Sequence, residues 1–164
     1  IQRIEDEKGI QLQIPTNYQV ALQENNFTWL RRISEKADLN LFFSKKTYEG
    51  EKDFNTNFIL KWREQITSNF IFSSKEDSSF MTIEKTASPL EKIISDSTQY
   101  SKYLYGLWRI NGAAKGGSYV SCTVKTPKND HIYYIEGFVY APGQEKLDYI
   151  RSLEAIIRTF EPVD

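Results

Sequence analysis

The sequence predicts an α+β domain in which an antiparallel β-sheet is flanked by helices, an α/β/α sandwich made of two meander-plus-helix halves. Three observations predict it. Residues 100–141 form an aromatic-rich β-meander, the strand at 102–110 carries bulky side chains on both faces, and two segments have the spacing of amphipathic helices. A sheet that is apolar on both sides needs a layer on each side, which the two helices supply.

The first half of the chain is predicted to be a meander followed by a helix. Residues 1–8 are mostly polar and are expected to be a linker or the end of an upstream domain, so that residues 9–164 form the single α+β domain. Alternation of apolar and polar residues predicts strands at 10–14, 18–22 and 27–33. A strand at 39–44 is apolar on both faces, which predicts that it is buried on both sides. Asp53 is the expected N-cap of a helix with an apolar stripe formed by Phe54, Phe58, Trp62 and Ile66.

The second half repeats this plan. A polar linker is predicted at 73–79, and the apolar segment 90–94 is too short to assign. Strands are predicted at 80–85, 102–110, 119–125 and 131–140. A turn between the last two of these strands places Cys122 opposite Ile135. A final helix at 145–160 has its apolar residues along one side.

Composition excludes several classes of function. The chain has 21 lysines and arginines against 22 acidic residues, a net charge of -1, so no nucleic-acid partner is expected. One cysteine and one histidine provide no disulfide and no metal-ligand spacing, and no cofactor is expected. No apolar run approaches the ~20 residues of a membrane span. The sequence starts at Ile1 without a charged and then apolar leader, so we expect a piece of a longer protein.

Nucleophilic catalysis by a Cys–His pair would need the single residues of each type, Cys122 and His131. The expected hairpin register separates them by four residues along the ladder, roughly 13 Å. Cys122 also alternates with Val120 and Val124, so we interpret it as a small core residue and His131 as a solvated turn residue. Serines and lysines are plentiful, which leaves a Ser–Lys arrangement open, but no S-x-x-K signature stands out.

Glu136 is an acid inside a predicted strand, where it alternates with aromatic residues. We expect a partly buried carboxylate that pairs with Arg109 or Lys125. A structural ion pair is the favoured interpretation. A glycosidase would need a second carboxylate facing it across a cleft.

Aromatic residues make up 14% of the chain, and many of its tyrosines gather in the meander. Most are expected to pack across strands, and some could form a platform for a sugar or a peptide. The glycine-rich segment 112–117 is interpreted as a tight connection between strands, with an anion-binding backbone nest as the alternative. The predicted binding residues are Trp29, Arg31, Trp108, Arg109, Lys115, Gly116 and Tyr119.

Several stretches together resemble a known family. They are GLWRING at 106–112, KGGSYVSCTV at 115–124, EGFVYAPG at 136–143, IPTNYQV at 14–20 and NFTWLRR at 26–32. The chain resembles the C-terminal domain of uncharacterised lipoproteins of Bacteroidetes-type bacteria, a domain of unknown function. The resemblance implies a periplasm-facing location in the cell envelope and membrane contact only through a lipid anchor upstream of this sequence. It assigns no activity and no residue role. The two halves also resemble the PsbP-like architecture.

These observations lead to one favoured function and two alternatives. We expect a non-catalytic domain of a cell-envelope lipoprotein that binds a protein, peptide or glycan. The first alternative is a hydrolase of envelope or dietary glycans that uses carboxylates such as Glu136. The second is a purely structural spacer, which would have an unbroken polar surface and no sizeable pocket.

Overall fold

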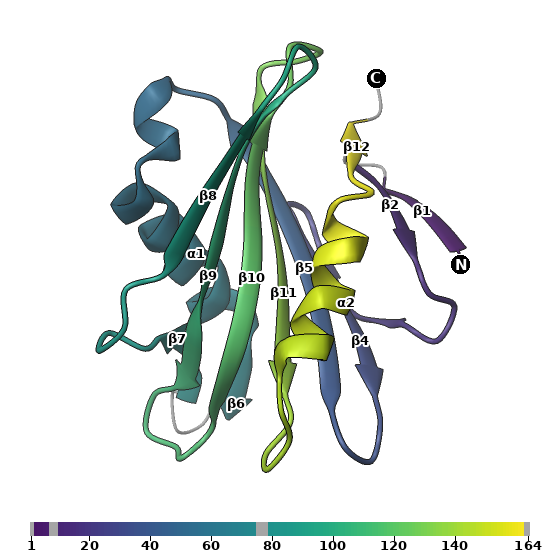
Figure 1. The fold of residues 1–164 in the computed structure, drawn as a ribbon, viewed down its shortest axis with the longest axis vertical. Helices are drawn as coiled ribbons and strands as arrows, with labels where there is room; N and C mark the ends of the chain where they lie inside the picture. Colours follow the sequence, from purple (N-terminus) through teal and green to yellow (C-terminus); the bar gives the residue numbers. More distant parts are fainter. Residues whose placement is uncertain (1, 7–9, 75–78, 163–164) are drawn as a thin grey trace.

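The structure, a computed structural model, describes residues 2–6, 10–74 and 79–162. Its main element is a curved nine-stranded antiparallel sheet, a half-barrel with one helix on each face (Figure 1). The strands are β1 Gln2–Asp6, β2 Ile10–Ile14, β3 Gln19–Glu24, β4 Phe27–Ile33, β5 Asp38–Thr47, β6 Phe72–Ser74, β7 Ser79–Ile83, β8 Leu90–Ser95, β9 Tyr100–Ile110, β10 Gly116–Lys125, β11 His131–Tyr140 and β12 Glu161–Pro162. The helices are η1 Glu51–Phe54, α1 Thr56–Phe70 and α2 Leu147–Ile157.

The sheet has the order β3-β4-β5-β11-β10-β9-β7-β6, and β8 also pairs with β9. The predicted hairpin register is confirmed, because Cys122 lies opposite Ile135 between β10 and β11. The β4–β5, β9–β10 and β11–α2 connections all turn at one end of the sheet, at the bottom of Figure 1. We call this the loop end. The β8–β9 and β10–β11 turns lie at the opposite end.

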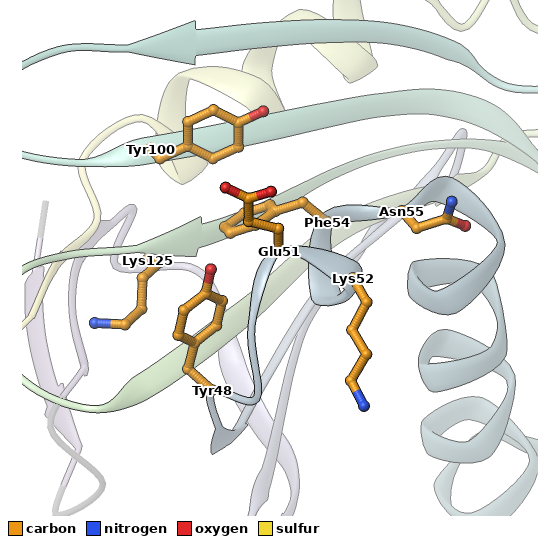
Figure 2. Close-up of a pocket in the computed structure, with 7 residues that line it drawn as sticks. All are labelled: Tyr48, Glu51, Lys52, Phe54, Asn55, Tyr100 and Lys125. Carbon is orange, nitrogen blue, oxygen red and sulfur yellow. The ribbon is translucent and has the colours of Figure 1, made fainter.

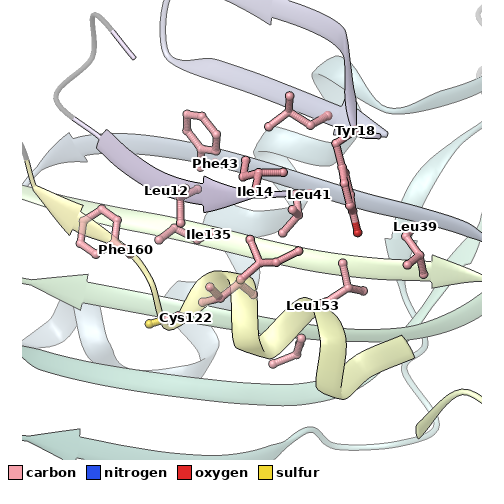
Figure 3. Packing of buried hydrophobic residues seen from close by; sticks show 14 of the residues in the cluster. Leu12, Ile14, Tyr18, Leu39, Leu41, Phe43, Cys122, Ile135, Leu153 and Phe160 are labelled. Atoms are coloured by element: carbon pink, nitrogen blue, oxygen red, sulfur yellow. The ribbon is translucent and has the colours of Figure 1, made fainter. Parts of the chain in front are cut away.

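The α2 face of the sheet holds one of two hydrophobic cores. Leu153 and Ile157 of α2 pack there with side chains of β2 and with the central strands (Figure 3). Cys122 is buried in this core, as predicted. Gly137 allows the close approach of α2, because a Cβ atom at that position would lie 2.7 Å from the Leu153 Cβ atom.

The α1 face holds the second core. Ile59, Trp62 and Ile66 of α1 pack against buried aromatic residues of the sheet, among them Phe42 and Tyr134. The predicted double burial of the strand at 39–44 is confirmed, since that part of β5 contributes to both cores. The prediction of an antiparallel sheet between two helices is therefore confirmed.

Some local predictions differ from the structure. Residues 2–6, which were predicted to be a linker or the end of an upstream domain, form β1 and pair with β2. The N-cap of α1 is Asn55, whose side chain accepts from the Asn57 amide, because Asp53 belongs to the preceding η1 turn. Phe58 lies on the exposed side of α1.

The remaining differences concern the second half. The unassigned segment 90–94 is strand β8. Residues 73–74 and 79, at the ends of the predicted polar linker, belong to strands, while 75–78 lie outside the described residues.

Candidate functional site

The loop end of the α1 face is the region where most of the predicted binding residues meet. The helix ends at Phe70, so the sheet beyond it has no helical cover on this side. A cavity of about 180 Å³ lies there, and Trp29, Arg31, Trp108 and Lys115 contribute to its lining. These residues come from β4, from β9 and from the β9–β10 loop.

A second hollow of about 450 Å³ adjoins the first and shares Trp108 and Lys115 with it. Arg109 and Gly116 line this second hollow. We call the two together the loop-end site. The loop end of the sheet therefore carries all the predicted binding residues except Tyr119, although Arg109 alternates with Trp108 along β9 and so points to the opposite face of the sheet.

Trp29 is held in place by polar contacts on two sides. Its indole nitrogen donates to the Asn40 side-chain oxygen over 3.0 Å, and the Arg31 guanidinium carbon lies 5.3 Å from the ring centroid. Arg31 also forms an ion pair with Asp38 at 3.7 Å. Since Trp29, Arg31 and Asp38 are only half-buried, this arrangement offers a fixed aromatic ring and a cation to a partner.

Tyr140 and Lys115 form a second pair of the same kind. The Lys115 ammonium lies 4.4 Å from the centroid of the Tyr140 ring. Tyr140 is half-buried and Lys115 is exposed. Tyr140 was not among the predicted residues, although it was visible in the sequence as one of the clustered tyrosines.

Trp108 forms the floor of the site. It is 3% exposed, its indole nitrogen donates to the Val139 carbonyl oxygen over 3.2 Å, and its ring packs edge-on against Phe138. Gly117 makes this packing possible, because a Cβ atom there would lie 2.2 Å from that same carbonyl oxygen. The glycine-rich segment is thus a tight strand connection, with β10 beginning at Gly116.

Tyr119 lies apart from the loop-end site. It is 2% exposed, and the Arg63 guanidinium carbon lies 4.4 Å from its ring centroid. Burial raises the pKa of Tyr119 to about 12, against the opposing effect of the Arg63 charge. Tyr119 therefore belongs to the buried core beneath α1.

A sealed ion pair occupies the middle of the α1 face. Glu136 is fully buried, and its carboxylate accepts from Arg63 Nε at 2.5 Å, from Arg63 Nη2 at 2.9 Å and from the Tyr134 hydroxyl at 2.6 Å. The predicted partners Arg109 and Lys125 are therefore wrong. The position of Arg63 in the sequence could have identified it as a buried residue, because it lies one turn after Ile59 and next to Trp62, on the side of α1 that packs against the sheet.

The surroundings of this pair raise the pKa values of Arg63 and Tyr134. Burial tends to lower the pKa of Arg63, but the charge and hydrogen bonds of Glu136, together with Tyr134, raise it above its ordinary value. Burial, followed by the Glu136 charge, raises the pKa of Tyr134 well above that of a free tyrosine. A buried carboxylate bound in this way does not meet a substrate, so Glu136 is not a general acid.

The Cys–His pair is also excluded as a catalytic unit. Cys122 is 3% exposed, and burial raises the pKa of its thiol to about 12. Its partner across the hairpin is Ile135, four residues from His131 along β11. Within the described part of the chain, no group of acids, histidines and cysteines could hold a metal ion.

A separate cavity of about 670 Å³ lies at the end of the sheet opposite the loop end. Its aromatic lining consists of Tyr48 after β5, Phe54 at the end of η1 and Tyr100 at the start of β9, and Glu51 also faces it (Figure 2). Sequence reasoning missed this cavity, because its residues come from segments about 50 positions apart. We call it the Tyr48 pocket.

The strand order and the two flanking helices define a class, an α+β domain with Mog1/PsbP-like fold neighbours. The chain belongs to the family described as "Domain of unknown function (DUF4837)", whose model matches residues 1–159. The predicted resemblance to such a family is confirmed. No curated protein matches the chain.

Two solved structures of Mog1 support the fold. The crystal structure of the Ran-binding protein Mog1p of Saccharomyces cerevisiae matches with a TM-score of 0.63 and 9% identity, over 99% of this chain and 95% of that one. A Mog1 point mutant matches with a TM-score of 0.61 and 11% identity, over 99% and 96%. A Bacteroides thetaiotaomicron structure has a TM-score of 0.47 and 11% identity, over 95% of this chain and 46% of that one. Among the described residues, no helix is long and apolar enough to cross a membrane.

Proposed function

We propose that this chain is a non-catalytic binding domain that recognises an acidic segment of a partner protein at the loop-end site. The observation that carries the proposal is the convergence of Trp29, Arg31, Lys115 and Tyr140 around one cavity. Tryptophan, tyrosine and arginine are the residue types most enriched among protein-interface hot spots. Arg31 contacts the Trp29 ring and Lys115 contacts the Tyr140 ring, so these side chains are already positioned before a partner binds.

The charge of the site supports an acidic partner. The ionised residues that line the two hollows are the cations Arg31, Arg109, Lys115 and Lys146 and the acids Asp38 and Glu84. Complementary charge at an interface steers encounter and selects the partner. A peptide or protein surface rich in aspartate and glutamate fits this excess of cations.

The alternatives have less support. The hydrolase hypothesis depended on an accessible Glu136, and that carboxylate is sealed under α1 by Arg63. A purely structural spacer would have no sizeable pocket, whereas cavities are present at both ends of the α1 face. Mog1p, which has the same fold, is a Ran-binding protein, so the fold is compatible with protein binding although it identifies no partner here.

The proposal includes a location. The resemblance to lipoproteins of Bacteroidetes-type bacteria supports a partner on the periplasmic side of the cell envelope, with this domain held there by an upstream lipid anchor. The experiment therefore uses an envelope extract of such a bacterium.

The test compares immobilised wild-type protein with the double variant Arg31→Glu/Lys115→Glu. We expect the wild type to retain a specific partner. The variant should retain at least about tenfold less of that partner, because two cations of the site become anions that repel an acidic segment. The matched control is Lys61→Glu/Lys92→Glu, which makes the same change in net charge at exposed positions outside the lining of both hollows.

Two results would contradict the proposal. One is equal retention by the wild type and the loop-end variant. The other is failure of the wild type to retain any protein, which would favour the structural role.

A further inference from the structure

The Tyr48 pocket is the feature that the proposed function leaves unused. Its walls differ in kind from the loop-end site, because aromatic rings surround a carboxylate there. We propose that this pocket binds an organic ammonium group, either a quaternary ammonium or the primary ammonium of a lysine side chain. The proposal is independent of the loop-end site.

The aromatic walls form a continuous set. The Phe54 ring lies 4.5 Å from the Tyr100 ring in an edge-on arrangement, and 6.1 Å from the Tyr48 ring at an interplanar angle of 58°. Rings at these different inclinations present faces and edges to one hollow (Figure 2). Aromatic faces carry negative partial charge and attract cations within about 6 Å of the ring centroid.

Glu51 supplies the full negative charge of the pocket. Its side chain is exposed, and it has neither a hydrogen bond nor an ion pair among the described residues. Figure 2 shows its carboxylate between the rings of Tyr48 and Tyr100. A carboxylate in such a position favours a cationic ligand, which gains both the ion pair and the ring contacts.

The two lysines that line the pocket are engaged elsewhere. The Lys52 ammonium lies 3.5 Å from the Glu49 carboxylate, and the Lys125 ammonium donates to the carbonyl oxygens of Thr126 and Asn129. Lys125 also lies 5.5 Å from the Tyr48 ring centroid, so that ring already accepts a cation on one face. Figure 2 shows both amines directed away from the space between the rings.

The titration of Tyr48 is consistent with this distribution of charge. Burial, then Glu51 and then Asp53 raise the pKa of the Tyr48 hydroxyl. The charge of Asp53 is itself partnered by Lys46 at 3.3 Å, and its other oxygen accepts from the Glu49 amide. Glu51 is therefore the acid left to meet a ligand.

The size of the pocket suits a small molecule or one side chain of a peptide. Its volume of about 670 Å³ is within the range of ligand sites, which runs from about 300 to 1,000 Å³. A free quaternary ammonium compound and a lysine in a peptide share the relevant chemistry, so the experiment uses a probe for each source.

The test is an NMR titration of the full chain with choline chloride and, separately, with N-acetyl-lysine amide. We expect saturable shifts of the backbone signals of Glu51, Phe54, Asn55 and Tyr100, with dissociation constants on the order of 1 mM at an exposed site. The probe that binds more tightly identifies the source. The neutral choline isostere 3,3-dimethylbutanol should cause no such shifts.

Variants separate the pocket from general electrostatics. Glu51→Gln should weaken binding of the cation by roughly threefold to tenfold. Glu145→Gln is the matched control, because it removes the same charge from an exposed side chain that does not line the pocket, and this variant should bind the cation as the wild type does. Arg31→Glu/Lys115→Glu should also bind normally, which distinguishes this site from the loop-end site.

Three outcomes would overturn the inference. The first is the absence of saturable shifts with both cations at 50 mM or so. The second is an equal effect of the neutral isostere. The third is an equal loss of affinity in Glu51→Gln and Glu145→Gln.

Discussion

Two cations on the α1 face make the same contact in opposite surroundings. The Arg63 guanidinium and the Lys115 ammonium each lie 4.4 Å from the centroid of a tyrosine ring, Tyr119 in one case and Tyr140 in the other. Arg63 is completely buried and bound to Glu136, while Lys115 is exposed and has no carboxylate partner among the described residues. Contact geometry alone therefore does not distinguish a structural residue from a binding residue.

What separates the two pairs is the length of α1. The helix covers the middle of the sheet and ends at Phe70, which stacks on Phe27 at the start of β4. Trp29 lies two residues further along β4, and Tyr140 is the last residue of β11. Under the helix, a cation needs a charged partner to be tolerated. Beyond the helix, water solvates the cation and leaves it available to another molecule.

The largest effect is expected from breaking the sealed pair. Arg63→Met leaves the Glu136 carboxylate buried without its cation, and we expect the free energy of unfolding to fall by about 3–5 kcal/mol. Urea denaturation at neutral pH measures this. The double variant Arg63→Met/Glu136→Leu should recover much of the loss, because an apolar pair needs no charge compensation. A loss below about 1 kcal/mol in the single variant would show that Glu136 finds another partner.

A second, smaller effect concerns alkaline pH. The pKa of Tyr119 is about 12 in the folded chain and 10.0 for a free tyrosine, so the folded state holds its proton more tightly. Its contribution to stability is complete below pH 10 and is lost as the pH rises towards 12, at about 1.4 kcal/mol per pH unit.

The measurement for this prediction is urea denaturation at a series of pH values from 8 to 11. Tyr119→Phe keeps the aromatic ring under Arg63. The free energy of unfolding of this variant should fall less steeply with pH than that of the wild type over the upper part of that range. Identical pH profiles for the variant and the wild type would contradict the assignment to Tyr119.

The smallest effect is expected at the open pair. Lys115→Gln removes an exposed cation from the Tyr140 ring, and we expect a change in unfolding free energy within about 1 kcal/mol. The Lys115→Gln variant should nevertheless bind the proposed partner more weakly, which would show that Lys115 contributes to binding and not to stability. A loss comparable to that of Arg63→Met would mean that Lys115 is part of the fold.

Much of the architecture could be predicted because its signals are local. Alternation indicates β2, and bulky side chains on both faces indicate β9, in each case from the strand's own residues. The short turn after β10 determines the hairpin register. The secondary structure of β8 was harder to predict because two of its apolar residues, Leu90 and Ile93, are exposed on opposite faces of an edge strand. Such a strand depends on pairing with β9 rather than on burial of one face.

The candidate site was only partly predictable. Trp29, Arg31 and Lys115 could be selected by residue type, but their meeting depends on the order of β4, β5, β11, β10 and β9 in the sheet. Arg63 was missed because a charged residue in a helix is normally assigned to the solvent side. The Tyr48 pocket needs η1 to return over the start of β9, and no local pattern encodes that contact.

The small sheet at the edge of the domain has a topological consequence. Gln11 and Ile10 pair with Glu5 and Asp6 of β1 on one side and with Glu161 and Pro162 of β12 on the other. The first and last described strands therefore meet the same two residues, and Figure 1 shows β1 and β12 close to β2. Because the first and last strands lie in the same small sheet, the domain is a candidate for circular permutation, in which these strands are linked and new termini are opened at another turn.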